Sequence, residues 1–329
     1  MPIRRLLPAL AFLIALTACG SPSANSTPSA EVTPAASPSG SPSAGLPSDN
    51  AATQTDLTGI TVTGPKGKAP KVTFHPKPFV IDKTQTKVLV EGKGDAARAD
   101  GYVKINYYGV NGRDGAVFDS SFSRGTPASF PLANVITGFK TGLTGQKVGS
   151  RVLVVVPSSE GYGETGSSDG TIKAGDTLIF VVDILAVSLV DPSGETVTPP
   201  AGLPTVTGAA NAKPTVTIPA TAAPTTMTAQ TLIKGTGDKV TKADTIYVRF
   251  VGYSWKTGKL IHDQWTPITG VLSSTIPGWK AGLVDKTVGS RVLLVLPPEY
   301  GYPDGANNPP LEKGDTIVYV VDILFAYQA

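Results

Sequence analysis

Residues 138–157 read GFKTGLTGQKVGSRVLVVVP, and residues 278–297 repeat this stretch as GWKAGLVDKTVGSRVLLVLP. Each copy is followed by a glycine-tyrosine loop, GYGETG from 161 or GYPDG from 301, and then by the run GDTLIFVVDIL from 175 or GDTIVYVVDIL from 314. The copies lie 140 residues apart at the first stretch and 139 apart at the last run, so the second loop is one residue shorter. The sequence therefore predicts a tandem duplication of one domain.

The repeat begins well before the quoted stretch. ITVTGPKGKAPKVTF from 60 aligns with PTVTGAANAKPTVTI from 204 at a constant offset of 144. Each unit thus carries a front segment rich in Thr and Val, whose role the sequence does not explain. The run DPSGETVTPPA from 191 is typical of a linker. We predict a first domain with its front segment at 58–190, a linker at 191–200, and a second domain with its front segment at 201–329.

Each main domain is predicted to combine a sheet with one short helix. Ile136, Phe139 and Leu143 are spaced three and four residues apart, which marks one buried face of a helix. Five stretches of the first domain alternate or are rich in β-branched residues and predict strands: 102–108, a segment including Phe118, 128–132, 150–156 and 177–187. The predicted fold class is α+β, with a five- or six-stranded antiparallel sheet in each domain.

Composition excludes several classes of function. The 329 residues are enough for about two domains with sizeable cores. The 28 Lys and Arg nearly balance the 25 Asp and Glu, and no basic run occurs, which argues against a nucleic-acid partner. Cys19 is the only cysteine, so an intramolecular disulfide and a cysteine-based metal site are excluded. We expect neither a metal nor a cofactor.

The N-terminus is predicted to be a targeting segment. Arg4 and Arg5 precede an apolar run, 6–16, that is too short to span a bilayer. The following LTACG resembles the lipid-attachment signal of bacterial lipoproteins, which implies a signal peptide at 1–18 and lipidation of Cys19; the alternative is a stray cysteine in the leader. Residues 19–57, rich in Ser, Pro and Ala, predict a disordered tether. We expect an extracytoplasmic monomer, lipid-anchored to the outer face of the bacterial cell membrane.

The order of short motifs in each domain resembles the FKBP-type peptidyl-prolyl cis–trans isomerases. In the first domain these motifs are YYG from 107, GAVFDSS from 115, VITGF from 135, VG from 148, GYG from 161 and LIFVVDIL from 178. The resemblance covers about 85–190 and 228–328. It implies two FKBP-like domains in tandem, each a twisted antiparallel β half-barrel wrapped around one short helix, with the binding pocket between helix and sheet.

The resemblance also implies a site in the first domain. Its catalytic group is Tyr162, whose hydroxyl is offered to a substrate carbonyl, with Asp119, Ile136 through its N–H, and Phe139 on the floor, where the family usually has Trp. Its substrate-binding residues are Tyr107, Phe118, Phe130, Val135, Ile172 and Phe180. Two departures from the family are Ala128, where an aromatic residue is common, and Ser167, which replaces a loop histidine.

The second domain keeps less of the pattern. Its corresponding residues are Phe250, His262, Asp263, Ile276, Trp279, Tyr302, Leu311 and Tyr319. The motif order matches His262 to Phe118, and Gly270 to Phe130. A histidine in an apolar wall should weaken proline binding. We therefore expect the first domain to be the catalyst and the second to be partly degenerate.

Isomerisation needs no proton transfer and no covalent intermediate. Rotation about a peptide bond interrupts amide resonance, against a barrier of about 18–20 kcal/mol. A site that binds the twisted amide better than the planar one lowers that barrier. The predicted function is thus a peptidyl-prolyl isomerase that assists the folding of proline-containing exported polypeptides. The alternatives are a non-catalytic protein that binds proline-containing chains and a structural spacer.

Each site residue also has a structural explanation. An aromatic residue on a helix or strand, such as Phe139 or Phe180, is usually core, and Tyr162 could be only a packing corner. The loop from 161 fits GxGxxG, but no helix follows it, so we reject a dinucleotide site. His262 and His75 are the only histidines in the chain, so we reject a metal site and a catalytic triad at His262.

Overall fold

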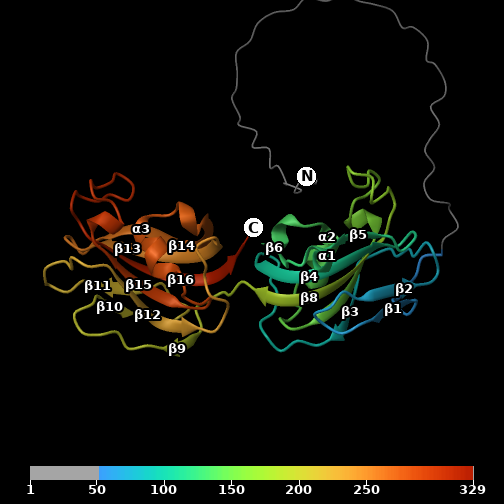
Figure 1. The fold of residues 1–329 in the computed structure, drawn as a ribbon, viewed down its shortest axis with the longest axis horizontal. Helices are drawn as coiled ribbons and strands as arrows, with labels where there is room; N and C mark the ends of the chain where they lie inside the picture. Colours follow the sequence, from blue (N-terminus) through green and yellow to red (C-terminus); the bar gives the residue numbers. More distant parts are fainter. Residues whose placement is uncertain (1–51, 329) are drawn as a thin grey trace, which may run out of the picture. The chain divides into compact units, whose positions relative to one another are not determined.

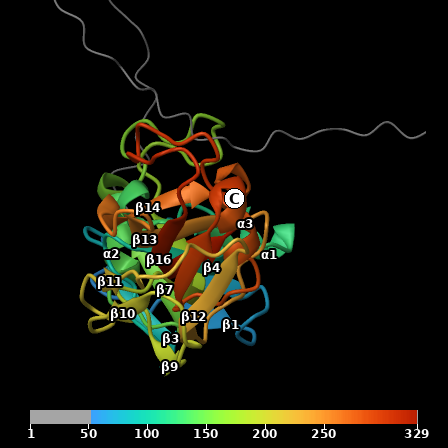
Figure 2. The same cartoon turned by 90° about the vertical axis from the view of Figure 1, so that its left-hand side faces the viewer.

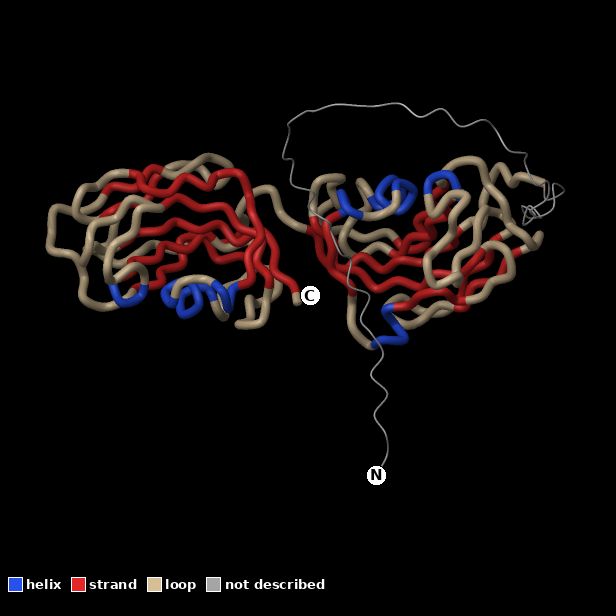
Figure 3. The backbone as a smooth tube through the Cα atoms, turned by 90° about the horizontal axis from the view of Figure 1, so that it is seen from above, coloured by secondary structure: helices blue, strands red, loops and turns tan. Residues whose placement is uncertain are grey.

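The computed structural model describes residues 52–328. The predicted signal peptide, Cys19 and most of the predicted tether lie outside these residues. Within them, each repeat forms one six-stranded sheet and a separate two-stranded hairpin (Figure 1). Strands dominate both domains, and the helices are short (Figure 3). No helix in the described residues is both long enough and apolar enough to span a membrane.

The first sheet has the order β3-β7-β8-β4-β5, and β6 also pairs with β4. Every pairing is antiparallel. The strands are β3 (Gln85–Val90), β4 (Tyr102–Asn111), β5 (Val117–Ser120), β6 (Ala128–Pro131), β7 (Arg151–Val156) and β8 (Leu178–Val187). The helices are α1 (Ser121–Arg124) and α2 (Thr137–Leu143), with 3₁₀ turns η1 (Leu132–Asn134) and η2 (Ser158–Glu160). The predicted α+β class is confirmed.

The second sheet has the order β14-β13-β16-β15-β12-β9. Its strands are β9 (Gly194–Thr196), β12 (Thr228–Gly235), β13 (Thr245–Ser254), β14 (Leu260–Val271), β15 (Arg291–Leu296) and β16 (Ile317–Tyr327). It also contains α3 (Pro277–Leu283), η3 (Leu272–Ser274) and η4 (Pro298–Tyr300). The uninterrupted β14 takes the place of β5, α1 and β6. In the first domain α1 is capped at its start by the Ser120 side chain and ended by Gly125 in the left-handed conformation.

The stretch that occurs twice forms the contact between helix and sheet. A Cβ atom added to Gly138 would lie 2.3 Å from a methyl group of Val156, and one added to Gly142 would lie 2.3 Å from a methyl group of Val154. Gly278 and Gly282 face Leu296 and Leu294 in the same way in the second domain. The two glycines, four residues apart, therefore let the helix backbone approach the sheet closely, which explains why both copies keep them.

The front segments cover the opposite face of each sheet (Figure 1). They form hairpins, β1 (Ile60–Thr63) with β2 (Lys71–Phe74), and β10 (Thr205–Thr207) with β11 (Thr215–Thr217). In the first domain the front segment builds a second hydrophobic cluster with alternate residues of the sheet, including Ile60, Phe74, Phe79, Leu153, Val155, Ile179 and Val181. Strands β7 and β8 are thus buried on both faces, which is why they read as continuous apolar runs rather than alternating ones.

A buried ion pair fastens each hairpin to its sheet. Arg151 donates to both carboxylate oxygens of Asp183, at 2.6 and 2.8 Å, and also to the carbonyl oxygens of Gly64, Pro65 and Lys68. In the second domain Arg291 donates to Asp322 and to carbonyl oxygens of its own hairpin loop. Burial of a guanidinium is tolerated when every donor finds an acceptor, and here the loop carbonyls complete the set.

The predicted linker, residues 191–200, contains secondary structure. Its β9 pairs with β12 and forms the edge of the second sheet. Asp191 accepts a hydrogen bond from Arg249 at 2.8 Å. A three-residue edge strand surrounded by Ser, Gly, Thr and Pro has no periodic signal, and its pairing depends on partners that lie 37 to 41 residues further along the chain.

Candidate functional site

The predicted substrate-binding residues of the first domain lie together between α2 and the sheet. One hydrophobic cluster contains Tyr107, Phe118, Phe130, Val135, Ile136, Phe139, Ile172 and Phe180. The ring centroids of Phe139 and Phe180 are 4.7 Å apart, and the Phe118 ring meets Phe180 edge-on at 5.4 Å. Phe139 and Phe180 are each only 6% exposed, while Tyr107 and Phe118 are half-buried. The arrangement is a fixed aromatic floor with partly exposed rings around it.

Local structure explains how these residues meet. Residue Tyr107 on β4 and residue Phe180 on β8 belong to neighbouring antiparallel strands, and Phe139 lies on α2, which is packed on the same face. Ile136 is the N-cap of α2, and its carbonyl accepts from the Lys140 N–H at 3.1 Å. Among the hydrogen bonds formed within residues 52–328, none uses the Ile136 N–H as donor. This N–H is the one that the resemblance predicts to hold a substrate carbonyl.

A polar group of three side chains borders the aromatic cluster. The Tyr107 hydroxyl donates to one oxygen of Asp119, and Arg124 donates to the other oxygen. Arg124 also donates to the Tyr107 hydroxyl at 2.9 Å. Burial, and then the hydrogen bond to Asp119, raise the pKa of Tyr107 to about 12. Tyr107 and Asp119 are therefore held in fixed positions, with the tyrosine protonated at physiological pH.

Tyr162 stands apart from that group. It follows η2 at the start of the loop 161–176, is 37% exposed, and none of the side-chain hydrogen bonds found in residues 52–328 uses its hydroxyl. Partial burial, and then the charges of Asp119 and Asp169, raise the pKa of Tyr162. The hydroxyl thus stays protonated at physiological pH and is available as a donor to a ligand.

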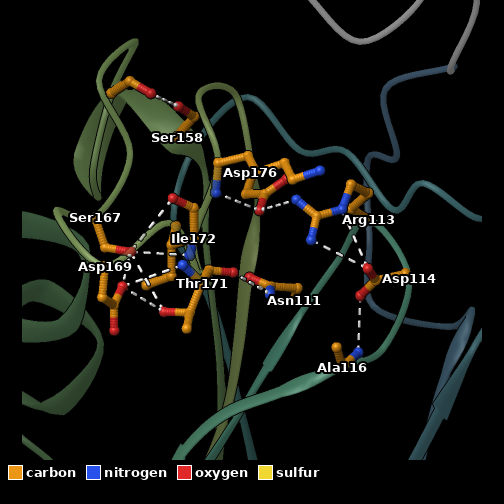
Figure 4. A network of polar contacts seen from close by, with 12 residues as sticks. Asn111, Arg113, Asp114, Ala116, Ser158, Ser167, Asp169, Thr171, Ile172 and Asp176 are labelled. Atoms are coloured by element: carbon orange, nitrogen blue, oxygen red, sulfur yellow. Dashed lines mark hydrogen bonds and ion pairs between the residues drawn. The ribbon is translucent and has the colours of Figure 1, made fainter.

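The loop that carries Tyr162 and Ile172 is braced by polar contacts that the sequence analysis did not foresee (Figure 4). The Asn111 amide, at the end of β4, donates to the Thr171 carbonyl at 2.9 Å. Arg113 donates to the buried Asp176 carboxylate at 2.8 Å. Within the loop, the Ser167 hydroxyl accepts from the Ile172 N–H at 2.9 Å. In each domain the corresponding loop extends from the helix side of the sheet (Figures 1 and 2).

The second domain also gathers its predicted residues around an aromatic cluster. The Phe250 and Trp279 rings meet edge-on at 4.8 Å, and Trp279 lies 5.5 Å from Tyr319. Ile276, Tyr302 and Leu311 pack against the same cluster. His262 Nδ1 lies 3.2 Å from the Tyr319 hydroxyl. Burial lowers the pKa of His262, and burial together with the neighbouring Tyr302 raises that of Tyr319.

The strand register corrects one correspondence between the domains. Gly109 of β4 pairs with Asp119, and its counterpart Gly252 of β13 pairs with His262. His262 therefore occupies the position of Asp119 rather than that of Phe118. Both strands bulge one residue earlier, so Phe118 corresponds to Ile261. The comparison of motifs matched Asp263 to Asp119 because both are aspartates, and this shifted His262 onto Phe118.

Asp263 does not join the second site. By the same register it corresponds to Ser120, and it forms an ion pair with Lys213 in a partly exposed position. The match of Gly270 to Phe130 holds, because Gly270 pairs with Ile246 as Phe130 pairs with Val103. The second site thus has Ile, His and Tyr319 where the first has Phe118, Asp119 and Phe180. In the described part of the chain no three His, Cys, Asp or Glu side chains are grouped to hold a metal ion.

Two half-barrels around short helices, each lined with aromatic side chains, define a protein of the proline-isomerase class. The family model of the FKBP-type peptidyl-prolyl cis–trans isomerases matches residues 93–185 and again 237–324. These matches cover more than half of the chain. The chain therefore belongs to this family, and the predicted tandem of FKBP domains is confirmed. Its enzyme class is that of isomerases acting on proline-containing polypeptides.

Curated relatives agree with this assignment. An FK506-binding protein of Streptomyces anulatus is 43% identical over 103 residues, which are 31% of this chain and 83% of that protein. A probable FK506-binding protein of Corynebacterium glutamicum is 39% identical over 98 residues, 30% of this chain and 81% of that protein. The peptidyl-prolyl cis-trans isomerase Mip of Coxiella burnetii is 42% identical over 105 residues, 31% of this chain and 44% of that protein.

Proposed function

We propose that the first domain is the catalyst of this isomerase and that the second domain binds proline-containing chains with altered preference. One observation carries the assignment. The first domain combines an aromatic cluster, the Tyr107–Asp119–Arg124 group and a Tyr162 hydroxyl that no side-chain hydrogen bond within residues 52–328 uses, whereas the second domain has His262 where the first has Asp119.

In this proposal the proline ring of a substrate lies against Phe139 and Phe180. The substrate carbonyls accept hydrogen bonds from the Ile136 N–H and the Tyr162 hydroxyl. A twisted amide has lost its resonance and with it much of its charge separation, so the apolar floor disfavours the planar ground state more than the transition state. The Tyr162 hydroxyl fixes the rotated geometry without transferring a proton. Asp119 acts through Tyr107, whose ring it holds in place.

The cellular role belongs to the same proposal. The LTACG motif and the apolar run before it support lipid attachment at Cys19, and the Ser/Pro/Ala-rich tether supports a reach of roughly 35 Å from the membrane. We propose that the chain, as an extracytoplasmic monomer, isomerises X–Pro bonds in exported polypeptides. Replacing Cys19 with Ala should move the chain from the membrane fraction to the soluble fraction, and retention in the membrane would refute the anchor.

A matched pair of tyrosine variants tests which domain catalyses. In the full chain, Tyr162→Phe should lower kcat/KM for a proline peptide by about tenfold, since one hydrogen bond to the transition state is lost. Tyr302→Phe, the same change in the second domain, should leave turnover unchanged. Equal losses would assign catalysis to both domains. No loss in either variant, with the fold intact by circular dichroism, would remove the tyrosine hydroxyls from the mechanism.

The alternative function is a non-catalytic protein that binds proline-containing chains. The polar His262–Tyr319 contact favours this function for the second domain. The two functions separate experimentally, because a binding protein would retain proline peptides in a pull-down while showing no isomerisation in either wild-type or variant form.

A further inference from the structure

The two sheets differ at the edge that lies next to β7 or β15. In the second sheet, residues 233–235 of β12 pair with the edge strand β9 (Gly194–Thr196). The N–H of Val197 extends this pairing by donating to the Leu232 carbonyl oxygen at 2.9 Å. In the first sheet, β3 is itself the last strand in the described part of the chain. The second domain thus shows that this edge accepts an antiparallel strand, and the first domain leaves it uncovered.

Strand register identifies the equivalent residues of the two edges. Val90 of β3 pairs with Arg151 after a bulge, as Ile233 of β12 pairs with Arg291 after a bulge. The next residue, Glu91, therefore lies where β12 meets β9. Among the backbone hydrogen bonds formed within residues 52–328, none uses the N–H or the carbonyl oxygen of Glu91. Both groups face a place that β9 fills in the second domain.

The uncovered edge also exposes apolar side chains. Val88 and Val90 are 46% and 45% exposed, whereas their counterparts Thr231 and Ile233 are partly buried. Sheet edges are usually protected by charges, by a bulge or by a covering segment. The bulge in β3 does not prevent pairing, because β12 has the same bulge and still pairs with β9.

The segment that precedes the first hairpin takes another course. In the second domain, β9 comes just before the hairpin of β10 and β11. In the first domain, Thr53 forms a bridge with Val80, and the Gln54 N–H donates to the Val80 carbonyl oxygen at 2.6 Å. The part of this segment that the structure describes therefore lies against Val80 and does not cover β3.

Charge indicates which kind of strand fits the edge. Lys234 of β12 pairs with Glu195 of β9, and opposite charges across a strand pair favour pairing. The first domain reverses the sign, because Glu91 stands at the position of Lys234. Its side chain lies 3.4 Å from the Lys147 ammonium, and both side chains are exposed, so this ion pair contributes little. A strand that pairs with this edge should place a lysine or an arginine opposite Glu91.

We propose that the β3 edge, residues 88–91, binds an extended segment of another polypeptide as an added antiparallel strand with a basic residue opposite Glu91. The main chain of Glu91 supplies a donor and an acceptor, which any sequence can use, and the exposed valines favour β-branched neighbours. Strands β7 and β8 separate β3 from β4, which carries Tyr107. The inference therefore goes beyond the proposed function and does not depend on it.

The chain supplies the sequence of a probe. The peptide Ser-Gly-Glu-Thr-Val-Thr copies residues 193–198, and a second peptide, Ser-Gly-Lys-Thr-Val-Thr, replaces the glutamate that lies opposite Lys234. Neither peptide contains proline, so neither reports on the proline site. By fluorescence anisotropy of labelled peptides, the full chain should bind the lysine peptide about fivefold more tightly than the glutamate peptide, because an opposite charge replaces a like charge across the strand pair.

Two variants of the full chain and one modified peptide supply the controls. Glu91→Lys should reverse the preference in favour of the glutamate peptide. Glu312→Lys, the same charge change at an exposed position of the second domain, should leave the preference unchanged. Hydrogen-bonded pairs recur at every second residue of an antiparallel ladder, so the residue opposite Glu91 donates its N–H as Val197 does. N-methylation of the peptide lysine should therefore weaken binding about fivefold.

Several results would overturn the strand site while leaving the proposed proline function intact. These are equal affinities for the lysine and glutamate peptides, and a lysine preference that survives Glu91→Lys. Binding that appears only after residues 20–51 are deleted would assign the edge to the chain's own tether. A dimer that dissociates on Glu91→Lys would assign it to a second copy of the chain. Either assignment would also overturn the proposed partner.

Discussion

The two domains share a backbone plan and differ where a ligand would be held. Both keep a helix with two glycines against the sheet, a hairpin on the other face and a buried arginine–aspartate pair. They differ at the position that pairs with the strand glycine shared by both domains: this position is Asp119 in one domain and His262 in the other. The comparison teaches that the duplicated packing residues set the fold, while a few positions on β5, β14 and the long loops set the site.

The largest effect is expected at the buried ion pairs. Asp322→Ala leaves both Arg249 and Arg291 without their shared carboxylate, whereas Asp183→Ala removes the carboxylate partner of Arg151 only. An uncompensated buried charge costs about 3–5 kcal/mol, so both variants should be strongly destabilised, and Asp322→Ala more so. Urea unfolding, followed by tryptophan fluorescence for the second domain and by circular dichroism for the whole chain, measures this. A loss below about 1 kcal/mol would mean that water reaches the guanidinium groups.

The next effect comes from giving the second site the residues of the first. The double variant Ile261→Phe/His262→Asp restores the wall ring and the carboxylate. We expect it to bind an all-alanine proline peptide about five- to tenfold more tightly, because an aromatic ring replaces a smaller side chain at the wall. Tryptophan fluorescence reports the affinity. Unchanged affinity would show that Tyr319 or the loop, rather than these two residues, limits binding.

A smaller effect is expected from neutralising the polar group. Asp119→Asn keeps the shape but weakens the charge-assisted hydrogen bonds that Asp119 accepts from Arg124 and from the Tyr107 hydroxyl. Turnover of the full chain should fall about threefold to tenfold, while His262→Asn should leave it unchanged. An isomerisation assay on both variants decides the matter; a loss with His262→Asn would place catalysis in the second domain as well.

The smallest effect concerns pH. Burial lowers the folded-state pKa of His262 below its usual 6.5, so its stabilising contribution is complete above pH 6.5 and is lost as the pH falls below that value. The second domain should melt at a lower temperature at pH 5.5 than at pH 7.5, and His262→Gln should reduce that difference. His75, the only other histidine, lies in the first domain and does not affect the tryptophan signal. An unchanged difference in the variant would assign the pH effect to carboxylates.

Much of the fold follows from local pattern. Three features could be predicted from the sequence because each depends on residues close in sequence. They are the tandem repeat, the β-branched central strands, and the short helix with its face of Ile136, Phe139 and Leu143. The aromatic residues of the first site were also predicted, and the structure brings Tyr107, Phe118, Phe130, Phe139 and Phe180 into one cluster, which does not include Tyr162. Their catalytic roles remain predictions.

Other features were decided only by the tertiary structure. The front segments pack as hairpins because they bury apolar side chains on a sheet face formed by strands far along the chain. Strand β9 forms because it pairs with the otherwise unpaired edge of β12. The strand register, which residue type alone does not reveal, places His262 at the position of Asp119. Arg124 and Asn111 join the site only through contacts across 5 and 60 residues of sequence. The sequence by itself determined which residues repeat and which faces are apolar. Strand register, bulges and long-range polar contacts depend on the balance of free energy between segments that are distant in sequence. These tertiary features decide how the two sites differ.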